Sequence, residues 1–321
     1  RDALEDMQTT VRGLDQKIKD LRTRGYVFGK DIEAQASNYE QQWQALYPSV
    51  SVQANQQAAN LQMGLRPIET QMTQLAGLTS NPAAARPLLD KTRAAAKVLE
   101  DRAEAAGRAV NGMYDSLRSE TQKLVSFLNK VDWMLKELAE ASFQLLATEA
   151  GVMAVKAVWV RGGKEQKEDP DGVLYLTDQR LLFEQKEEIA TKKVLFIATE
   201  KEKVQNLLLE APVALVEGVS ASKQGMLRNE DHIEIKFAAG APVQAAHFHI
   251  WQSCEEWQAF IQRARAKEFD QERAVPLDPA RLEQARSAPS QCPSCGGNLN
   301  QVILRGQDEI KCEYCGFVIR L

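Results

Sequence analysis

Apolar residues that recur every three or four positions run through the first half of the chain, and this pattern limits the fold more than any other feature. Between Leu4 and Leu21 the steps alternate between three and four, which is the 3.5-residue period of a coiled-coil seam. The stripe resumes after Gly25, and we expect Pro48 to end that helix. A second stripe passes Pro67, where we expect a kink or a split. Such helices bury their stripes against each other or against a second chain.

The longest stripe runs from Leu88 to Leu145, after an N-cap signal at Asn81-Pro82. Few breakers interrupt residues 88–149, so the pattern predicts one helix of about sixty residues, roughly 90 Å long. The economical arrangement is an elongated antiparallel helical bundle over residues 1–149. Because the stripe at 54–75 is too short to cover this seam, we also expect self-association through part of the 1–46 or the 88–145 stripe.

The pattern changes to short β-rich runs at Gly151. Strands are predicted at 152–160, 173–177, 180–183, 193–198, 213–219, 232–237 and 243–251, and the second and third make a hairpin. Two capping boxes predict a short helix over 200–209 and a longer one ending near residue 269; they are Thr199 with Glu202, and Ser253 with Glu256. Six or so strands closed by one amphipathic helix make a small α+β barrel-like domain over residues 151–270.

The predicted hairpin reads Gly172-Val-Leu-Tyr-Leu-Thr177-x-x-Arg180-Leu-x-Phe183, and a helix with a tryptophan closes the region. This combination resembles the GRAM branch of the pleckstrin-homology (PH) superfold. The resemblance implies a β-barrel with a C-terminal capping helix, and it implies that Arg180 is structural. Residues 186–209 depart from the family pattern, because they insert a predicted strand and helix.

Phosphoinositide-binding members of the superfold use basic residues beside the first strand–strand loop. By this resemblance Arg161, Lys164 and Lys167 are candidates for a lipid or anion site. Four acidic residues interleave with them, and the Lys…Arg-x-Arg pattern of strong lipid binders is absent. A solvated loop of mixed charge is the competing interpretation, and it predicts weak or no membrane binding.

The C-terminal tail carries four of the five cysteines as two C-x-x-C pairs separated by sixteen residues: Cys292, Cys295, Cys312 and Cys315. Four soft thiolates at this spacing are typical of one tetrahedral Zn²⁺ ion, and a glycine follows each pair where a tight knuckle needs backbone freedom. The tail resembles a rubredoxin-type zinc ribbon over residues 290–321, behind a proline-rich linker at 271–289. Protein fills all four ligand positions, so the predicted zinc is structural. Disulfides or free thiols are the alternative.

The remaining reactive side chains have weaker signals. Cys254 lies at a predicted helix N-terminus beside two glutamates, which favours a structural cysteine over a reactive one. His247 and His249 lie two residues apart and therefore on the same strand face, a spacing at which two histidines can bind one metal ion. His232 is remote in sequence, so an ordinary surface pair is the preferred interpretation.

Charge excludes some functions. The chain has 40 Lys+Arg against 44 Asp+Glu, and no region is basic, so nucleic-acid binding through the ribbon is disfavoured. No nucleophile–base motif or phosphate loop is present, and we expect no enzymatic activity.

We predict a cytoplasmic adaptor or scaffold that docks protein partners through the PH/GRAM-like domain and the ribbon. The alternative is a peripheral membrane protein that binds lipid through the bundle and the GRAM-like domain. The chain opens on Arg1 rather than on methionine, which is compatible with a missing upstream segment.

Overall fold

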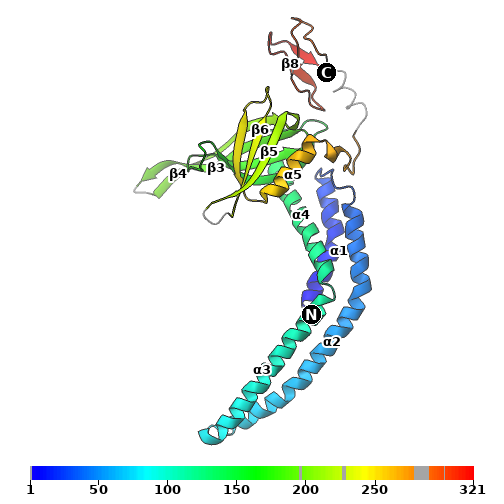
Figure 1. Cartoon of the computed structure of the whole chain (residues 1–321), viewed down its shortest axis with the longest axis vertical. Helices are drawn as coiled ribbons and strands as arrows, with labels where there is room; N and C mark the ends of the chain where they lie inside the picture. Colours follow the sequence, from blue (N-terminus) through cyan, green and yellow to red (C-terminus); the bar gives the residue numbers. More distant parts are fainter. Residues whose placement is uncertain (1, 195–196, 226–228, 278–288, 300) are drawn as a thin grey trace. The chain divides into compact units, whose positions relative to one another are not determined.

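The computed structural model describes residues 2–194, 197–225, 229–277, 289–299 and 301–321, and it describes no side chains for residues 2 and 188–202. The chain divides into two compact units, Arg1–Ile18 with Ile32–Ser126, and Lys19–Asp31 with Phe127–Leu321. The described part of the first unit is mainly helical. The second unit holds an antiparallel sheet of seven strands and a small two-stranded sheet (Figure 1). The chain is thus α plus α+β, as the sequence predicts.

Four helices build the first unit or enter it: α1 (Asp2–Thr23), α2 (Ile32–Ala76), α3 (Pro82–Gly112) and α4 (Asp115–Ala139). The α1 stripe is buried, with Val11 at 2% exposure and Leu14 at 1%. Helices α2 and α3 run antiparallel, and the predicted N-cap at Asn81 is confirmed, because its side-chain oxygen accepts a hydrogen bond from the Ala84 amide at 3.3 Å (Figure 1). Fewer side chains are buried toward the turn that joins α2 to α3.

Two predictions about helix ends are wrong. Helix α2 does not end at Pro48 and is not split at Pro67, because a proline removes one helical hydrogen bond without ending a helix whose neighbouring turns stay packed. Trp43 and Val50 are buried on either side of Pro48. Conversely, the predicted helix over 88–149 is broken at residues 113–114, where Tyr114 is buried and contacts Trp43 with ring centroids 5.5 Å apart. An aromatic contact of this kind offsets the interruption.

The large sheet has the strand order β4-β3-β2-β1-β7-β6-β5. Its strands are β1 (Gly151–Val160), β2 (Asp171–Thr177), β3 (Arg180–Val194), β4 (Ile197–Pro212), β5 (Val216–Gln224), β6 (Glu230–Phe237) and β7 (Ala245–Ile250). Helix α5 (Cys254–Arg265) packs on β5 and β6 and buries Trp257 and Ile261 completely. The predicted cap is confirmed, since the Ser253 hydroxyl accepts a hydrogen bond from the Glu256 amide. The predicted β2–β3 hairpin is confirmed as well.

The predicted helix over 200–209 is wrong, because these residues lie in β4 and pair with β3 in a long hairpin. The backbone hydrogen bonds of that pairing outweigh a capping-box pattern, whose own contribution is small. The strand expected at 213–219 begins instead with a 3₁₀ turn at Val213–Leu215. The last helix ends at Arg265 rather than near residue 269, and Lys267 adopts a left-handed conformation with φ of 59° just beyond it.

A buried ion pair fixes the β2–β3 turn. The Arg180 guanidinium, 6% exposed, donates from Nε to both oxygens of the fully buried Glu149 carboxylate at 2.9 and 3.1 Å. It also donates to the Gln144 carbonyl at 2.9 Å and pairs with Glu210. The Thr177 hydroxyl donates to Glu149 at 2.6 Å. Arg180 is therefore structural, as its place in the hairpin motif implies.

We expect Arg180→Ala to lower the free energy of unfolding of the sheet unit by about 3–5 kcal/mol, because it leaves the Glu149 carboxylate buried without its partner. Chemical denaturation followed by tryptophan fluorescence measures this loss. Arg161→Ala removes the same charge from an exposed position and is expected to change stability by less than about 0.5 kcal/mol. Equal losses in the two variants would contradict the structural role of Arg180.

Candidate metal centre

The four cysteines of the tail lie on two matching backbone knuckles. In the first, Gly296 adopts a φ of 73° and its amide donates to the Cys292 carbonyl at 2.8 Å. In the second, Gly316 adopts a φ of 72° and its amide donates to the Cys312 carbonyl at 2.9 Å. A side chain would be strained at these positive φ values, so glycine is required where each thiol pair turns inward.

The thiols converge at the spacing of a metal tetrad. Cys292 Sγ lies 3.7 Å from Cys315 Sγ, and Cys295 Sγ lies 3.7 Å from Cys312 Sγ. All four sulfur atoms lie within 4.8 Å of one another. A disulfide would hold two sulfurs at about 2.05 Å, whereas a tetrahedral ion with metal–sulfur bonds of about 2.3 Å holds them about 3.8 Å apart. The tetrad can therefore hold one metal ion, and the spacing fits Zn²⁺.

Backbone amides favour thiolate formation at one corner of the tetrad. Hydrogen bonding from the Cys315 amide, together with that from Tyr314, lowers the pKa of Cys312 to about 7. At Cys295 the Gly297 amide acts in the same direction, but the neighbouring Cys315 and Cys312 thiols raise the pKa of Cys295 to about 12. Four thiolates so close together repel one another, and a bound divalent cation removes that repulsion.

A very small core supports the knuckles. Strands β8 (Glu309–Lys311) and β9 (Val318–Arg320) form a hairpin that buries Ile310 and Ile319 beside Cys292 and Cys312. Three partly buried side chains complete this cluster: Leu299, Ile303 and Leu321. A core of this size is too small to stabilise a fold by itself, and a metal ion at the tetrad would add the missing stability.

The residues between the two knuckles contact the β2–β3 turn of the large sheet. The Gln179 side-chain amide donates to the Arg305 carbonyl at 2.8 Å, and its oxygen accepts from the Arg305 amide. The Arg305 guanidinium donates to both oxygens of Asp270, at 2.9 and 3.0 Å, and pairs with Asp178, which also binds Arg273. This contact was not predicted, because nothing in the sequence connects Arg305 of the tail with Gln179 and Asp178, which lie 126 and 127 positions away.

The three candidate lipid-binding residues lie in the loop between β1 and β2, and their role stays a prediction. The Arg161 guanidinium stacks 5.1 Å from the centre of the Trp159 ring, while Lys164 and Lys167 are exposed. The Asp169 carboxylate shapes this loop, since it accepts hydrogen bonds from the Arg161 amide at 3.1 Å and the Gln166 amide at 2.8 Å. The loop thus has an ordered backbone of its own.

Cys254 is buried at the start of α5, and burial raises the pKa of its thiol to about 11. Its amide donates to Asp231 Oδ1 at 2.8 Å. A protonated thiol in this position agrees with the structural role expected from the sequence.

His232 is remote in sequence from His247 and His249, but the structure brings it beside them. It lies directly opposite His249 on the neighbouring strand, and its Nδ1 atom lies 3.1 Å from His247 Nε2. The antiparallel pairing of β6 with β7 brings these residues together, and sequence distance cannot reveal such a register.

Known proteins offer little further information. No family model matches the chain, and no curated protein matches it. Similar solved structures include the Vps36 N-terminal PH domain, at 12% identity and a TM-score of 0.25 over 37% of this chain and 83% of that one. The DH/PH domains of p115-RhoGEF match at 10% identity and a TM-score of 0.24, over 83% and 91%. Likeness at this level identifies neither family nor function. Among the described residues, no helix is both long and apolar enough to cross a membrane.

We expect protein purified without added metal to contain close to one equivalent of zinc, and Cys312→Ser to lower that content sharply, because three thiolates hold Zn²⁺ less tightly than four. Elemental analysis measures the content, and hydrogen exchange at β8 and β9 reports the loosened tail. Ser294→Ala changes the first knuckle without touching a thiol and is the matched control. Iron, or fully formed disulfides after purification under reducing conditions, would contradict the zinc assignment.

Proposed function

We propose that the chain is a non-enzymatic adaptor or scaffold in which a structural zinc ribbon presents a docking surface to a protein partner. The observation that carries the proposal is an exposed apolar surface on the second knuckle. Tyr314 is 67% exposed, Phe317 is 46% exposed and Val318 is 45% exposed. We call these three residues the ribbon surface. Exposed aromatic side chains that are held in place cost little entropy on binding, and they are typical of interface anchors.

The ribbon surface is held by the knuckles themselves. A Cβ atom added to Gly297 would lie 2.6 Å from the Tyr314 ring, so the ring packs directly on that glycine while most of the side chain stays exposed. Phe317 follows the second knuckle, and its carbonyl accepts a hydrogen bond from the Cys312 amide at 2.9 Å. A metal at the tetrad would therefore fix the positions of both aromatic side chains, while four protein ligands leave it no position for a catalytic water.

The ribbon surface can be tested by capture experiments with the full chain as bait. We expect a partner bound by the wild type to be lost from Tyr314→Ala with Phe317→Ala, because two aromatic anchors of an interface commonly contribute 2 kcal/mol or more each. The variant retains all four cysteines, so its zinc content is expected to stay unchanged. Tyr47→Ala removes an exposed aromatic residue from the helical unit and is the control. A partner captured equally by all three proteins would contradict docking through the ribbon.

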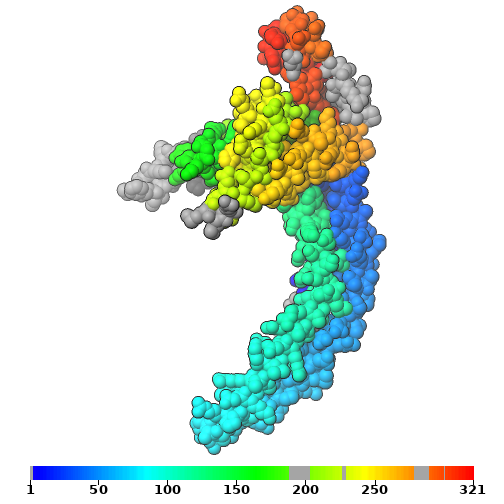
Figure 2. Space-filling view, in the orientation of Figure 1, coloured from blue at the N-terminus to red at the C-terminus, as the bar shows by residue number. Residues whose placement is uncertain are grey.

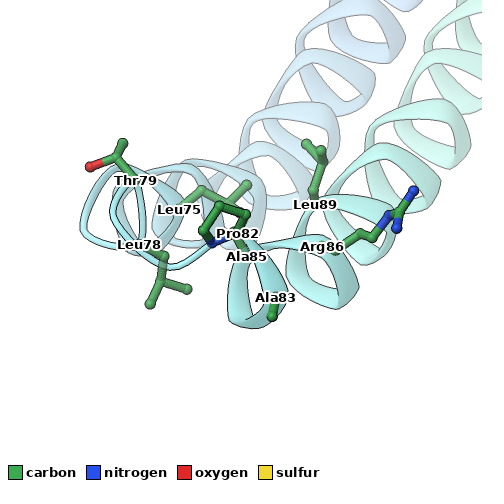
Figure 3. Close-up of a pocket in the computed structure, with 8 residues that line it drawn as sticks. All are labelled: Leu75, Leu78, Thr79, Pro82, Ala83, Ala85, Arg86 and Leu89. Atoms are coloured by element: carbon green, nitrogen blue, oxygen red, sulfur yellow. The ribbon is translucent and has the colours of Figure 1, made fainter.

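The helical unit supports a second part of the proposal, which is self-association. Near the turn that joins α2 to α3 the described residues bury little, and Met63 and Met72 are each 59% exposed. An apolar hollow of about 560 Å³ lies at this turn, lined by residues that include Leu75, Leu78 and Leu89 (Figure 3). Figure 2 shows α2 and α3 side by side, with no further described element over the visible face of this turn. Two helices alone leave apolar surface that a second copy can cover.

We expect the full chain to dimerise, and Leu65→Glu with Met72→Glu to weaken the dimer, because charges replace two exposed apolar side chains on one face of α2, at 42% and 59% exposure. Analytical ultracentrifugation over a concentration series measures the change. Asn60→Glu with Thr70→Glu adds the same charge at exposed polar positions and is the control. A monomer at every concentration would refute self-association and leave docking through the ribbon intact.

Membrane binding through the loop between β1 and β2 remains the alternative function. A basic side chain near an anionic leaflet contributes about 1 kcal/mol, and the three candidates are all exposed, although the Arg161 guanidinium stacks on Trp159. We therefore expect no saturable co-sedimentation with phosphatidylserine or phosphoinositide liposomes at physiological salt. Saturable binding that Lys164→Glu with Lys167→Glu abolishes would instead favour the peripheral membrane protein.

A further inference from the structure

All three histidines of the chain gather on one face of the β6–β7 pair, which we call the histidine cluster. The rings of His232 and His249 stack with their centres 4.7 Å apart and their planes 15° apart. The His247 ring lies 5.1 Å from that of His232. On this face the His232 side chain is 5% exposed and that of His249 is 14% exposed, so imidazole groups that are usually hydrated have been taken largely out of water.

Two nitrogen atoms of the cluster already have the spacing of metal ligands. His232 Nδ1 and His247 Nε2 lie 3.1 Å apart. Tetrahedral Zn²⁺ with nitrogen ligands at about 2.0–2.1 Å holds its ligand atoms roughly 3.3 Å apart, so a small displacement would admit an ion between the two rings. Without an ion, one of these two nitrogens carries a proton and donates a hydrogen bond to the other.

Two carboxylates are placed where a metal site needs its outer hydrogen bonds. His249 Nδ1 lies 2.6 Å from Glu165 Oε2, and a proton held there leaves Nε2 of the same ring free as a ligand. His232 Nε2 is buried and has no hydrogen-bond partner among the described residues, and Glu230 Oε2 lies 3.8 Å from it. If Nδ1 of His232 bound a metal, its proton would move to Nε2, and the Glu230 carboxylate could accept it.

Two histidines of the cluster are in the neutral form that can bind a cation. Burial, reinforced by the neighbouring imidazoles, lowers the pKa of His232, and burial lowers the pKa of His247. Both rings are therefore neutral at neutral pH, the form that binds metals. An open hollow of about 460 Å³, lined in part by His247, Glu234 and Arg161, provides access from solvent.

We propose that His232, His247 and His249 form a second metal site, separate from the cysteine tetrad, that takes one divalent transition-metal ion such as Zn²⁺. Imidazole nitrogen suits this class of cation better than it suits Mg²⁺ or Ca²⁺. In the described structure, no set of three nitrogen atoms, one from each of the three rings, lies within 4.8 Å of one another. Binding therefore requires the His249 ring to turn from its stacks on His232 and Trp251, and the exposed Glu165 side chain to follow its Nδ1 atom.

Imidazole nitrogen-15 resonances test the proposal in the full chain, because every histidine lies in the cluster and the cysteine tetrad contains none. Zn²⁺ is titrated at about pH 7.5 into protein whose tetrad is already loaded. We expect one added equivalent to bind saturably and to shift the ring nitrogens of all three histidines. His232→Asn and His247→Asn are expected to lose this binding, and Glu230→Gln to weaken it about 10–100-fold.

Lys236→Gln alters an exposed side chain on the same strand and is expected to bind the added zinc as the wild type does. Mg²⁺ at the same concentration is expected to leave the ring nitrogens unshifted. The wild-type spectrum decides the question even if a histidine variant fails to fold. If any of the three rings keeps its free resonances at saturating Zn²⁺, or if a folded His232→Asn variant binds as tightly as the wild type, the three-imidazole site is overturned.

Discussion

The buried ion pair between Arg180 and Glu149 holds the β2–β3 turn of the second unit in place. It joins the start of β3 to the segment that precedes β1, and it is almost wholly removed from solvent. Because the pair orients the β2–β3 turn, it also positions Asp178 and Gln179, which receive Arg305 from the tail. A buried network of charges and hydrogen bonds of this kind makes the turn that receives Arg305 rigid.

The features that the sequence predicted well depend on short-range chemistry. The spacing of the four cysteines, with a glycine after each pair, determines how two knuckles can face each other, and the thiols converge as that spacing predicts. The β2–β3 hairpin follows from alternation around a short turn, and the caps at Asn81 and Ser253 follow from local hydrogen bonds. In each case the residues concerned lie within a few positions of one another, or a metal can join them.

The features that the sequence did not predict depend on partners distant along the chain. Residues 200–209 have a helical capping signal, but β3 pairs with most of them along a long hairpin. Tyr114 interrupts a long helical pattern because its ring packs on Trp43, and His232 meets His247 only through the register of β6 and β7. Local propensity could not have revealed any of these, because tertiary pairing decides each one.

The proposed adaptor role depends on one claim, that the cysteine tetrad is a closed structural zinc site that holds the ribbon surface in place. X-ray absorption at the zinc edge, on full-length protein carrying one equivalent of zinc, tests this claim most directly. The account predicts a single shell of four sulfur ligands at about 2.3 Å with no nitrogen or oxygen ligand. A shell containing water oxygen or imidazole nitrogen would show an open or different site, and it would contradict the claim.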